Sequence, residues 1–319
     1  MKKQVLLILP ALLLSGCFSK TNNNSNTSEK EVDISKLKIV CPTGAPAFAF
    51  YDFANNSSFE TNSTPSNIVA MMSAAGNKDV VVIDTTSGIK AINNGAPFKM
   101  LANITFGNFF IASTGNDDNE TMDVGDTIVL FGQNQTPDLL FHYLYGDQFD
   151  STIEYVTNVQ DAAKCLISGK NAVTTSTVDY VFVAQPVLYN AMQKNANAKM
   201  YIDVQDAYKT KSGGKSLIQA SVFVKNSVDS KVVDVFAKKI SSDISAAVSN
   251  PDIITEKLKG LSAEEATALY GVNPTIAATV LKDNNGLGLG YKLAKENKDN
   301  IDSFISLFSL ENTNEEIYY

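Results

Sequence analysis

The 319-residue chain carries 26 basic and 34 acidic side chains, which gives a formal net charge of −8. This acidic balance disfavours nucleic acid or an anionic membrane surface as the main partner. Every basic residue is a lysine, because the sequence contains no arginine. An anionic ligand would therefore have to be held by lysine, by hydroxyl groups or by backbone N–H groups, without a bidentate guanidinium.

The beginning of the chain has the pattern of a secretory signal. Two lysines precede the apolar run Val5–Leu14, which is shorter than the roughly 20 residues that span a bilayer. The run leads into Leu-Ser-Gly-Cys, which resembles the bacterial lipobox. Residues 1–16 are therefore predicted to be a signal peptide and Cys17 a lipidated N-terminus, with an ordinary signal peptide as the alternative. Residues 17–36, rich in Asn, Ser and Thr, would form a flexible tether.

Two further cysteines, Cys41 and Cys165, lie more than a hundred residues apart. The sequence leaves open whether they form a disulfide. Neither has neighbours at metal-ligand spacing, so two buried free thiols are the favoured interpretation.

After the tether, short apolar runs alternate with helical patterns, which predicts parallel sheets covered by helices. The runs at 37–40 and 80–83 are continuously apolar, as in strands buried on both faces. The first series comprises strands at 37–40, 80–83, 98–104 and 108–112, with helices at 66–76 and 85–95. Ser66 is the expected N-cap of the first of these helices.

A second series follows a polar stretch and has the same alternation. Its predicted strands lie at 127–131, 152–156, 180–184 and 219–225, and its helices at 137–145, 159–168 and 186–195. The rest of the chain is mainly helical, with a capping box at Ser262–Glu265 and a helix beginning at Asn273-Pro274. Because the chain is long for one core, we expect two α/β lobes with a cleft between them and a helical C-terminal tail.

The sequence offers little support for catalysis. His142 is the single histidine, and it lies in an aromatic helical segment that favours a packing role. Signatures of metal hydrolysis, dithiol redox chemistry and a nucleophilic serine elbow are absent from the sequence. The stretch Gly286–Gly290 lacks the spacing of a dinucleotide loop and is interpreted as a loop between tail helices. No catalytic residue, metal or cofactor is therefore predicted.

Three strand-to-helix junctions are better candidates for a site. "CPTGAPAFAFY" follows the strand at 37–40, "DTTSG" the strand at 80–83, and "GQNQTPD" the strand at 127–131. In open α/β sheets, ligands bind beyond the carboxyl ends of strands, where helix N-termini offer unpaired N–H groups. Each junction taken alone is also explained by ordinary helix capping, with Thr136 as the expected N-cap of the third.

Four stretches together resemble the solute-binding lipoproteins of ABC importers, in the nitrate/sulfonate/thiamine-precursor-like group. They are "TGAPAFAFY", "VVVIDTTSGIKAINNGAPFKMLANITFGNFFI", "FGQNQTPDLLFHYLY" and "VDYVFVAQPVLYNAM". The resemblance covers about residues 37–308 and implies a type II periplasmic-binding-protein fold. Family members often carry A-E-P where this chain has Ala184-Gln185-Pro186, so a carboxylate near the cleft is replaced by an amide.

The resemblance also implies a division into lobes and a set of ligand contacts. Lobe one would comprise residues 37–111 and 224–319, and lobe two residues 112–223, with two strand crossovers as the hinge. Phe48, Phe50, Tyr51 and Phe106 are candidates for stacking on a ligand ring. The implied ligand-binding residues are Gly44, Ala45, Pro46, Thr85, Thr86, Ser87, Gly107, Asn108, Thr136, Pro137, Asp138, Gln185 and Pro186.

By this resemblance the chain would be a monomeric, lipid-anchored receptor on the extracytoplasmic face of a bacterial membrane. It would close on a small molecule and deliver it to an ABC permease and its ATPase. The missing arginines and Gln185 favour a neutral or weakly charged heterocycle, such as a vitamin or pyrimidine precursor.

Three alternatives remain open from the sequence. The first is a sulfonate- or nitrate-type anion receptor of the same fold. The second is an enzyme on the same scaffold, for which Asp84, Asp138 and His142 would be the available groups. The third is a surface adhesin lipoprotein.

Overall fold

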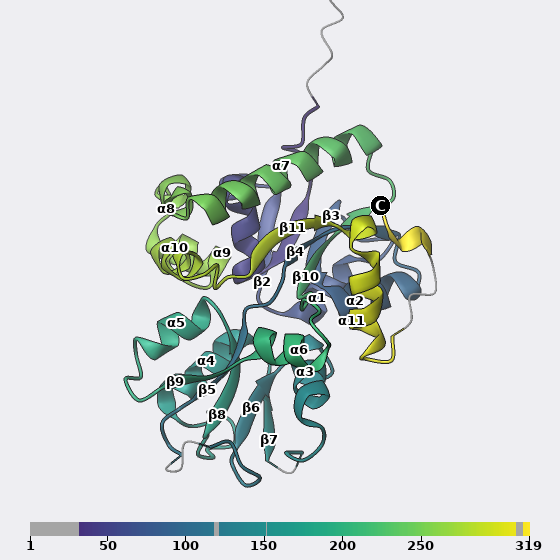
Figure 1. Cartoon of the computed structure of the whole chain (residues 1–319). Coiled ribbons are helices and arrows are strands. Elements are labelled where there is room, and N and C mark those ends of the chain that lie inside the picture. Colours follow the sequence, from purple (N-terminus) through teal and green to yellow (C-terminus); the bar gives the residue numbers. More distant parts are fainter. Residues whose placement is uncertain (1–31, 118–120, 151, 311–314) are drawn as a thin grey trace, which may run out of the picture. The chain divides into compact units, whose positions relative to one another are not determined.

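The computed structural model describes residues 32–117, 121–150, 152–310 and 315–319 (Figure 1). The predicted signal peptide, Cys17 and most of the tether lie outside this part. Residues 32–319 form one compact unit. No helix of the described chain is both long enough and apolar enough to cross a bilayer.

Two β-sheets organise this unit. In spatial order, the six-stranded sheet contains β11 (Leu289–Leu293), β4 (Phe98–Thr105), β10 (Ala220–Lys225), β3 (Val80–Asp84), β1 (Ile39–Pro42) and β2 (Phe59–Asn62). The five-stranded sheet contains β7 (Ile153–Val156), β6 (Ile128–Phe131), β8 (Tyr180–Ala184), β5 (Phe109–Ser113) and β9 (Lys199–Asp203). Each sheet with its covering helices forms one lobe, as Figure 1 shows.

Helices flank both sheets. Those of lobe one and the C-terminal tail are the 3₁₀ helix η1 (Ala45–Phe53), α1 (Pro65–Met71), α2 (Thr85–Asn93), α7 (Ser230–Ser249), α8 (Asp252–Leu258), α9 (Ala263–Tyr270), α10 (Pro274–Lys282), the 3₁₀ helix η2 (Ala294–Glu296), α11 (Lys298–Ser306) and the 3₁₀ helix η3 (Glu315–Ile317). Those of lobe two are α3 (Thr136–Tyr145), α4 (Val159–Ser168), α5 (Val187–Met192) and α6 (Val204–Lys211). The predicted two-lobed α/β fold with a helical tail is confirmed.

The sheets are mixed rather than purely parallel. β1 pairs in parallel with β2 and β3, whereas β10 is antiparallel to both β3 and β4. In lobe two, β5 is likewise antiparallel to β8 and β9. β10 and β5 are the strands that enter each lobe directly from the other lobe. They therefore arrive without the crossover helix that a parallel neighbour requires.

These two entry strands also correct the predicted lobe boundaries. The boundaries at residues 111/112 and 223/224 fall inside β5 and β10. The whole of β5 lies in the five-stranded sheet and the whole of β10 in the six-stranded sheet. The chain therefore passes between lobes at residues 106–108 and again at 212–219.

Three strands were missed because their sequences are not apolar runs. β2 and β9 carry mostly polar or exposed side chains, and β11 begins within the stretch interpreted as a loop between tail helices. The first predicted helix is also shorter than expected. Thr64 rather than Ser66 is the N-cap of α1, because Pro65 is tolerated at the first helical position, and the helix ends at Met71. The capping box of Ser262 and Glu265 is confirmed.

Candidate functional site

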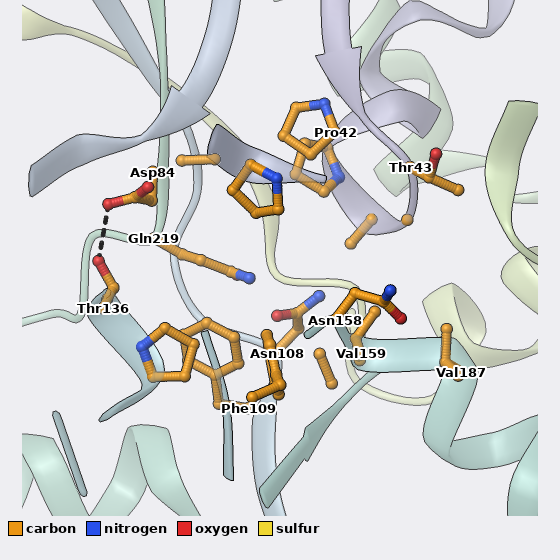
Figure 2. A pocket seen from close by; sticks show the side chains of 18 of the residues that line it. Pro42, Thr43, Asp84, Asn108, Phe109, Thr136, Asn158, Val159, Val187 and Gln219 are labelled. Carbon is orange, nitrogen blue, oxygen red and sulfur yellow. Dashed lines mark hydrogen bonds between the residues drawn. The ribbon is translucent and has the colours of Figure 1, made fainter. Parts of the chain in front are cut away.

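A cavity of about 110 Å³ lies between the two lobes and is lined by both (Figure 2). From lobe one it receives the turn after β1, including Thr43 and Gly44, and Asp84 at the end of β3. From lobe two it receives the beginning of α3, with Thr136 and Pro137. These segments lie at the carboxyl ends of parallel strands, which is where ligands bind in open α/β sheets. We call this cavity the interlobe pocket.

Several predicted ligand-binding residues line this pocket. They are Gly44, Ala45, Pro46, Asn108, Thr136, Pro137 and Gln185. Gly44 has a φ of +122°, a backbone conformation that favours glycine, and it connects β1 to η1. Thr136 is the first residue of α3 rather than its N-cap, which is Gln135. The structure therefore brings together three widely separated parts of the sequence.

The predicted hydroxyl cluster at the start of α2 has a different role. Thr85, Thr86 and Ser87 do not contribute to the lining of the interlobe pocket. The Thr85 hydroxyl is buried and lies 2.7 Å from that of Ser221 in β10. Thr86 Oγ1 and the backbone N–H of Ser87 donate to Asp84 Oδ1, as expected for an Asp N-cap. The cluster stabilises the helix terminus and presents Asp84 toward the pocket.

A hydrogen bond joins the lobes at one side of the pocket. Thr136 Oγ1, in lobe two, donates to Asp84 Oδ1, in lobe one, over 2.9 Å (Figure 2). The same hydroxyl lies 3.0 Å from Thr86 Oγ1. Asp84 Oδ1 thus accepts hydrogen bonds from the Thr86 hydroxyl, the Ser87 backbone and the Thr136 hydroxyl. This arrangement stabilises contact between the two lobes.

Gly107, Asp138 and Pro186, also predicted as ligand contacts, do not line the interlobe pocket. Gly107 lines a separate cavity of about 660 Å³ near the first crossover, the segment 106–108 in which the chain passes from lobe one to lobe two. Pro186 is buried and directly precedes α5. Asp138 accepts hydrogen bonds from the Asn134 backbone N–H at 2.7 Å and from the Tyr155 hydroxyl at 2.8 Å. These contacts hold the first turn of α3 against β7.

The aromatic wall of the pocket differs from the prediction. Phe48, Phe50 and Tyr51 are buried in the hydrophobic core around η1, because that helix packs against β-strands and against α7–α9. Phe106 lines the cavity that contains Gly107. The rings that line the pocket are instead Phe109 and Phe131, whose centroids are 6.2 Å apart.

Four pocket residues with amide side chains were missed by sequence reasoning. Gln135 and Asn158 precede helices, whereas Gln160 and Gln219 lie in α4 and just before β10. Asn158 is the N-cap of α4 and accepts from the backbone N–H of Asp161. The strand-to-helix junction "VTNVQ" has the same form as the three junctions identified above and could have been found by the same argument. No comparable sequence pattern marked Gln219, because this residue reaches the pocket only through the second of the two segments that connect the lobes.

The pocket is poor in charge. Asp84 is the one ionisable side chain among its described lining residues, which include no lysine. Most of the remaining walls are apolar, formed by prolines, by Phe109 and Phe131, and by Val159 and Val187. The described lining therefore offers no cation to an anionic ligand, and it contains no histidine or cysteine and only one carboxylate with which to bind zinc.

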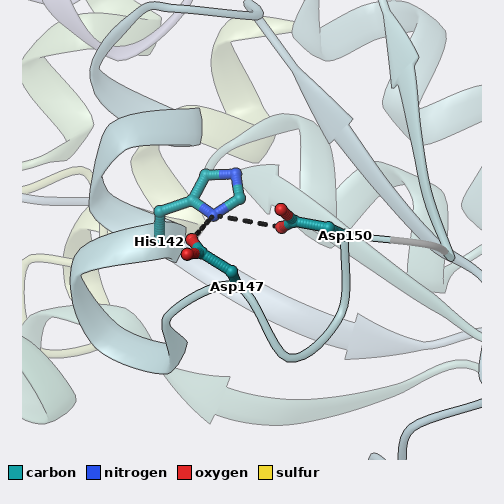
Figure 3. A group of neighbouring side chains, drawn as sticks. All are labelled: His142, Asp147 and Asp150. Carbon is teal, nitrogen blue, oxygen red and sulfur yellow. Dashed lines mark ion pairs between the residues drawn. The ribbon is translucent and has the colours of Figure 1, made fainter.

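The groups considered for catalysis do not assemble in the pocket. His142 lies in the last turn of α3 and does not line it. Its Nε2 atom is 3.3 Å from Asp138 Oδ1, and its Nδ1 atom is 3.7 Å from Asp147 and 3.6 Å from Asp150 (Figure 3). Ligand atoms of His142, Asp147 and Asp150 lie within 4.8 Å of one another. Both aspartates are exposed, however, and such acidic groups commonly do no more than surround a histidine with negative charge.

The two cysteines of the described chain are buried free thiols on different lobes. Cys41 lies in β1 and Cys165 in α4. Burial raises the pKa of both thiols. The sequence left open whether these two cysteines form a disulfide, and in the structure they do not.

Comparison with known proteins extends these observations. No family model and no curated protein sequence matches the chain. Solved structures do match. An ABC transporter protein from Parabacteroides distasonis is similar with a TM-score of 0.66 and 18% identity, covering 86% of this chain and 92% of that one. The zinc-bound ligand-binding component of a Staphylococcus aureus ABC-type import system has a TM-score of 0.62, 11% identity and coverage of 86% and 92%.

The periplasmic aliphatic sulphonate binding protein of Escherichia coli is also similar, with a TM-score of 0.60 and 12% identity over 86% of this chain and 88% of that one. At these identities the likeness concerns the fold. In both sheets of this chain, the strand that enters from the other lobe lies inside the sheet rather than at its edge. The expected architecture is thereby confirmed: the chain has the type II periplasmic-binding-protein fold of ABC-importer solute-binding proteins.

Proposed function

We propose that the protein is the extracytoplasmic substrate-binding component of an ABC importer. The observation that carries the proposal is the interlobe pocket, to which both lobes contribute polar groups and apolar walls. A ligand that contacts both lobes binds the closed arrangement better than the open one. Such a ligand would therefore shift the protein toward the closed arrangement, with the two segments that connect the lobes acting as the hinge. The closed, loaded protein would then deliver its ligand to a permease and its ATPase.

The remaining parts of the proposal come from the sequence. Cys17 would carry the lipid that anchors a monomeric protein to the extracytoplasmic face of the membrane, and the tether would let the compact unit reach the permease. The similar structures support the transport role, since they are an ABC transporter protein, the ligand-binding component of an ABC-type import system and a periplasmic sulphonate binding protein. They also argue against an enzyme, for which the pocket offers only Asp84 among its described lining residues, and that carboxylate already accepts three hydrogen bonds.

For the ligand, we propose a neutral or weakly charged heterocycle. One similar protein binds aliphatic sulphonates and another was solved with zinc. The interlobe pocket of this chain suits neither ligand, because its described lining contains no lysine and a single carboxylate. Its prolines and two phenylalanine rings would instead pack on the faces of a planar ring. A dissociation constant near micromolar, about −8 kcal/mol, would suit capture and release.

Thermal unfolding of the purified protein with a metabolite panel tests the proposal. The panel sets thiamine precursors, flavins and nucleobases beside taurine, nitrate and phosphonates. A ligand present at a hundred times its dissociation constant stabilises the folded state by about 2.7 kcal/mol, which raises the unfolding midpoint by a few degrees. Small-angle scattering with the stabilising compound should show a more compact protein. A protein that no compound stabilises or compacts would favour the adhesin alternative.

A further inference from the structure

Three amide side chains in the interlobe pocket have buried carbonyl oxygens that no protein group satisfies. Within the described residues, Asn108 Oδ1, Gln160 Oε1 and Gln219 Oε1 accept no hydrogen bond. All three residues line the same pocket. Unsatisfied buried polar atoms are rare in folded proteins, because each one costs free energy, so a cluster of three in one cavity requires an explanation.

Asn108 is the most informative of the three. The residue is only 2% exposed, and its Nδ2 atom donates a 2.8 Å hydrogen bond to the backbone carbonyl of Gln185. Rotating the amide by half a turn would place two oxygens against each other. Oδ1 therefore remains the end that is free to accept (Figure 2). The amides of Gln160 and Gln219 can rotate to present either an acceptor or a donor.

The charge of the pocket limits what can meet these oxygens. Asp84 is the single ionisable residue of the described lining, and its Oδ1 atom already accepts three hydrogen bonds. An anion whose oxygens only accept hydrogen bonds would face Asn108 Oδ1 and the Asp84 carboxylate with no lining lysine to compensate. Burying such a charge with no cation beside it is costly.

We propose that the ligand is an uncharged ring compound that donates N–H or O–H hydrogen bonds to Asn108 Oδ1 and to the amides of Gln160 and Gln219. This inference rests on the proposed function and names the ligand chemistry that the pocket selects. The cavity volume of about 110 Å³ is close to the roughly 150 Å³ of a cavity that accommodates benzene. In this arrangement of the lobes the cavity therefore holds no more than about one ring, and Phe109 and Phe131 form part of its wall.

Matched ring pairs test the donor requirement directly. Uracil is compared with pyrimidine, phenol with benzene, and pyrrole with furan, together with methanesulfonate and nitrate as ions that only accept. Binding is measured by calorimetry and by the thermal unfolding midpoint of the purified protein. We expect the donor-bearing member of at least one pair to bind at least tenfold more tightly than its partner, and the two anions not to bind. Because the donor-free rings are no larger, exclusion by size cannot produce this difference.

The outcomes separate this inference from the proposed function. Binding of methanesulfonate or nitrate with the tightest affinity of the set would overturn the inference and leave a solute receptor in place. Equal binding within every ring pair would also overturn it. Absence of binding by every ring and every anion would contradict the proposed function together with the inference.

Substitutions of single pocket residues test which side chains bind the donor groups of the ligand. Gln160→Met and Gln219→Met keep the side-chain length and remove the amide, and each should weaken binding of the best donor probe roughly tenfold. Gln193→Met, on the exposed end of α5, is the matched control and should leave binding unchanged. Asn108→Leu should abolish binding, and the two glutamine variants decide the question if that variant does not fold. Unaltered affinity in both glutamine variants would contradict the inference.

Discussion

Thr136 Oγ1 donates a hydrogen bond to Asp84 Oδ1, and this hydrogen bond joins the N-terminus of α3 in one lobe to the end of β3 in the other. Both residues also line the interlobe pocket. A contact that holds the lobes together therefore lies beside the proposed ligand site. If the protein closes on its ligand as proposed, closure and binding would be coupled through these atoms.

Thr136→Val tests this coupling. Valine keeps the shape of threonine and removes the hydrogen bond to Asp84, together with the 3.0 Å contact to the Thr86 hydroxyl. We expect a loss of about 1 kcal/mol in the free energy of unfolding and a several-fold weaker ligand affinity, since the closed arrangement loses part of its stabilisation. Small-angle scattering should show a larger radius of gyration than for the unaltered protein.

Thr267→Val is the matched control for this experiment. Its hydroxyl donates to a carbonyl of its own helix, Ala263 O in α9. The control should change neither the radius of gyration nor ligand affinity. An identical response of the two variants would show that the Asp84–Thr136 contact does not influence closure.

Phe131→Leu tests the aromatic wall. Phe131 ends β6, lines the interlobe pocket and contacts Phe109 and Phe182 edge-on. Leucine removes the ring face while retaining an apolar side chain. The affinity for a ring ligand should fall roughly tenfold, whereas stability should fall by less than about 1.5 kcal/mol. Calorimetry with the best ligand of the panel measures the first effect and chemical denaturation the second.

Phe308→Leu provides the comparison, because Phe308 is also half-buried and contacts Phe304 away from the pocket. It should lose similar stability and keep full affinity. If both variants bind as well as the unaltered protein, the aromatic wall does not contact the ligand.

Much of the fold could be predicted because its central strands have distinctive sequences. β3 and β8 are continuous apolar runs, and their predicted positions agree closely with the structure. β2, β9 and β11 were missed for the opposite reason. They lie at sheet edges and contain polar residues or glycine among their apolar residues, so they lack a continuous hydrophobic pattern.

The pocket was harder to predict than the fold. Gly44, Thr136 and Pro137 were found because they occupy strand-to-helix junctions, a position that local sequence reveals. Gln219 and Phe109 reach the pocket through the two crossovers, and their place depends on how the lobes meet. The aromatic rings of η1 show the opposite error, since they were predicted to contact the ligand and lie elsewhere. An aromatic cluster beside a junction was assigned to the site, although η1 buries those rings in the core of lobe one.

The ion-pair cluster of Asp52 gives a pH-dependent prediction. Asp52 Oδ2 accepts from Lys239 Nζ at 2.5 Å and Oδ1 from Lys257 Nζ at 2.8 Å. The hydrogen bonds from Lys239 and Lys257 lower the pKa of Asp52 below its ordinary value of 3.8. A carboxyl whose pKa is lower in the folded state stabilises that state above its unfolded pKa. This stabilisation is lost as the pH falls below 3.8 and through the folded value.

Asp52→Asn should therefore cost about 1 kcal/mol of unfolding free energy at pH 7 and progressively less as the pH falls below 3.8. Urea denaturation of both proteins at about pH 7, 4 and 3 measures the difference. Asp234→Asn, an exposed substitution on α7, should have little effect at any pH. A difference between Asp52→Asn and the unaltered protein that stays constant across this pH range would contradict the role assigned to the ion pairs.

The buried thiols predict protection from modification. Cys41 and Cys165 are enclosed in different lobes, and burial raises the pKa of each thiol, so little reactive thiolate forms. In the folded protein both should react with a thiol reagent orders of magnitude more slowly than in concentrated guanidinium chloride. Mass spectrometry after a timed pulse of iodoacetamide identifies the modified residue. Rapid labelling of either cysteine in native buffer would show that its lobe opens locally.

Gly288 is predicted to be indispensable at the first crossover. Its carbonyl accepts a 2.8 Å hydrogen bond from the Phe106 backbone N–H, and its φ is +63°. A Cβ atom at this position would overlap the carbonyl oxygen of Gly107. Gly288→Ala must therefore displace either the crossover or the turn before β11, in addition to adopting a left-handed conformation.

Gly213→Ala separates these two effects, because Gly213 has a φ of +73° and no atom lies within 4 Å of the place that its new methyl group would take. The left-handed conformation alone should cost Gly213→Ala about 1 kcal/mol. Gly288→Ala adds the steric overlap and should lose about 3 kcal/mol in chemical denaturation. It should also weaken ligand binding, since the crossover on which closure depends is displaced. Equal losses of stability in the two variants would show that the contact between Gly107 and Gly288 yields without cost.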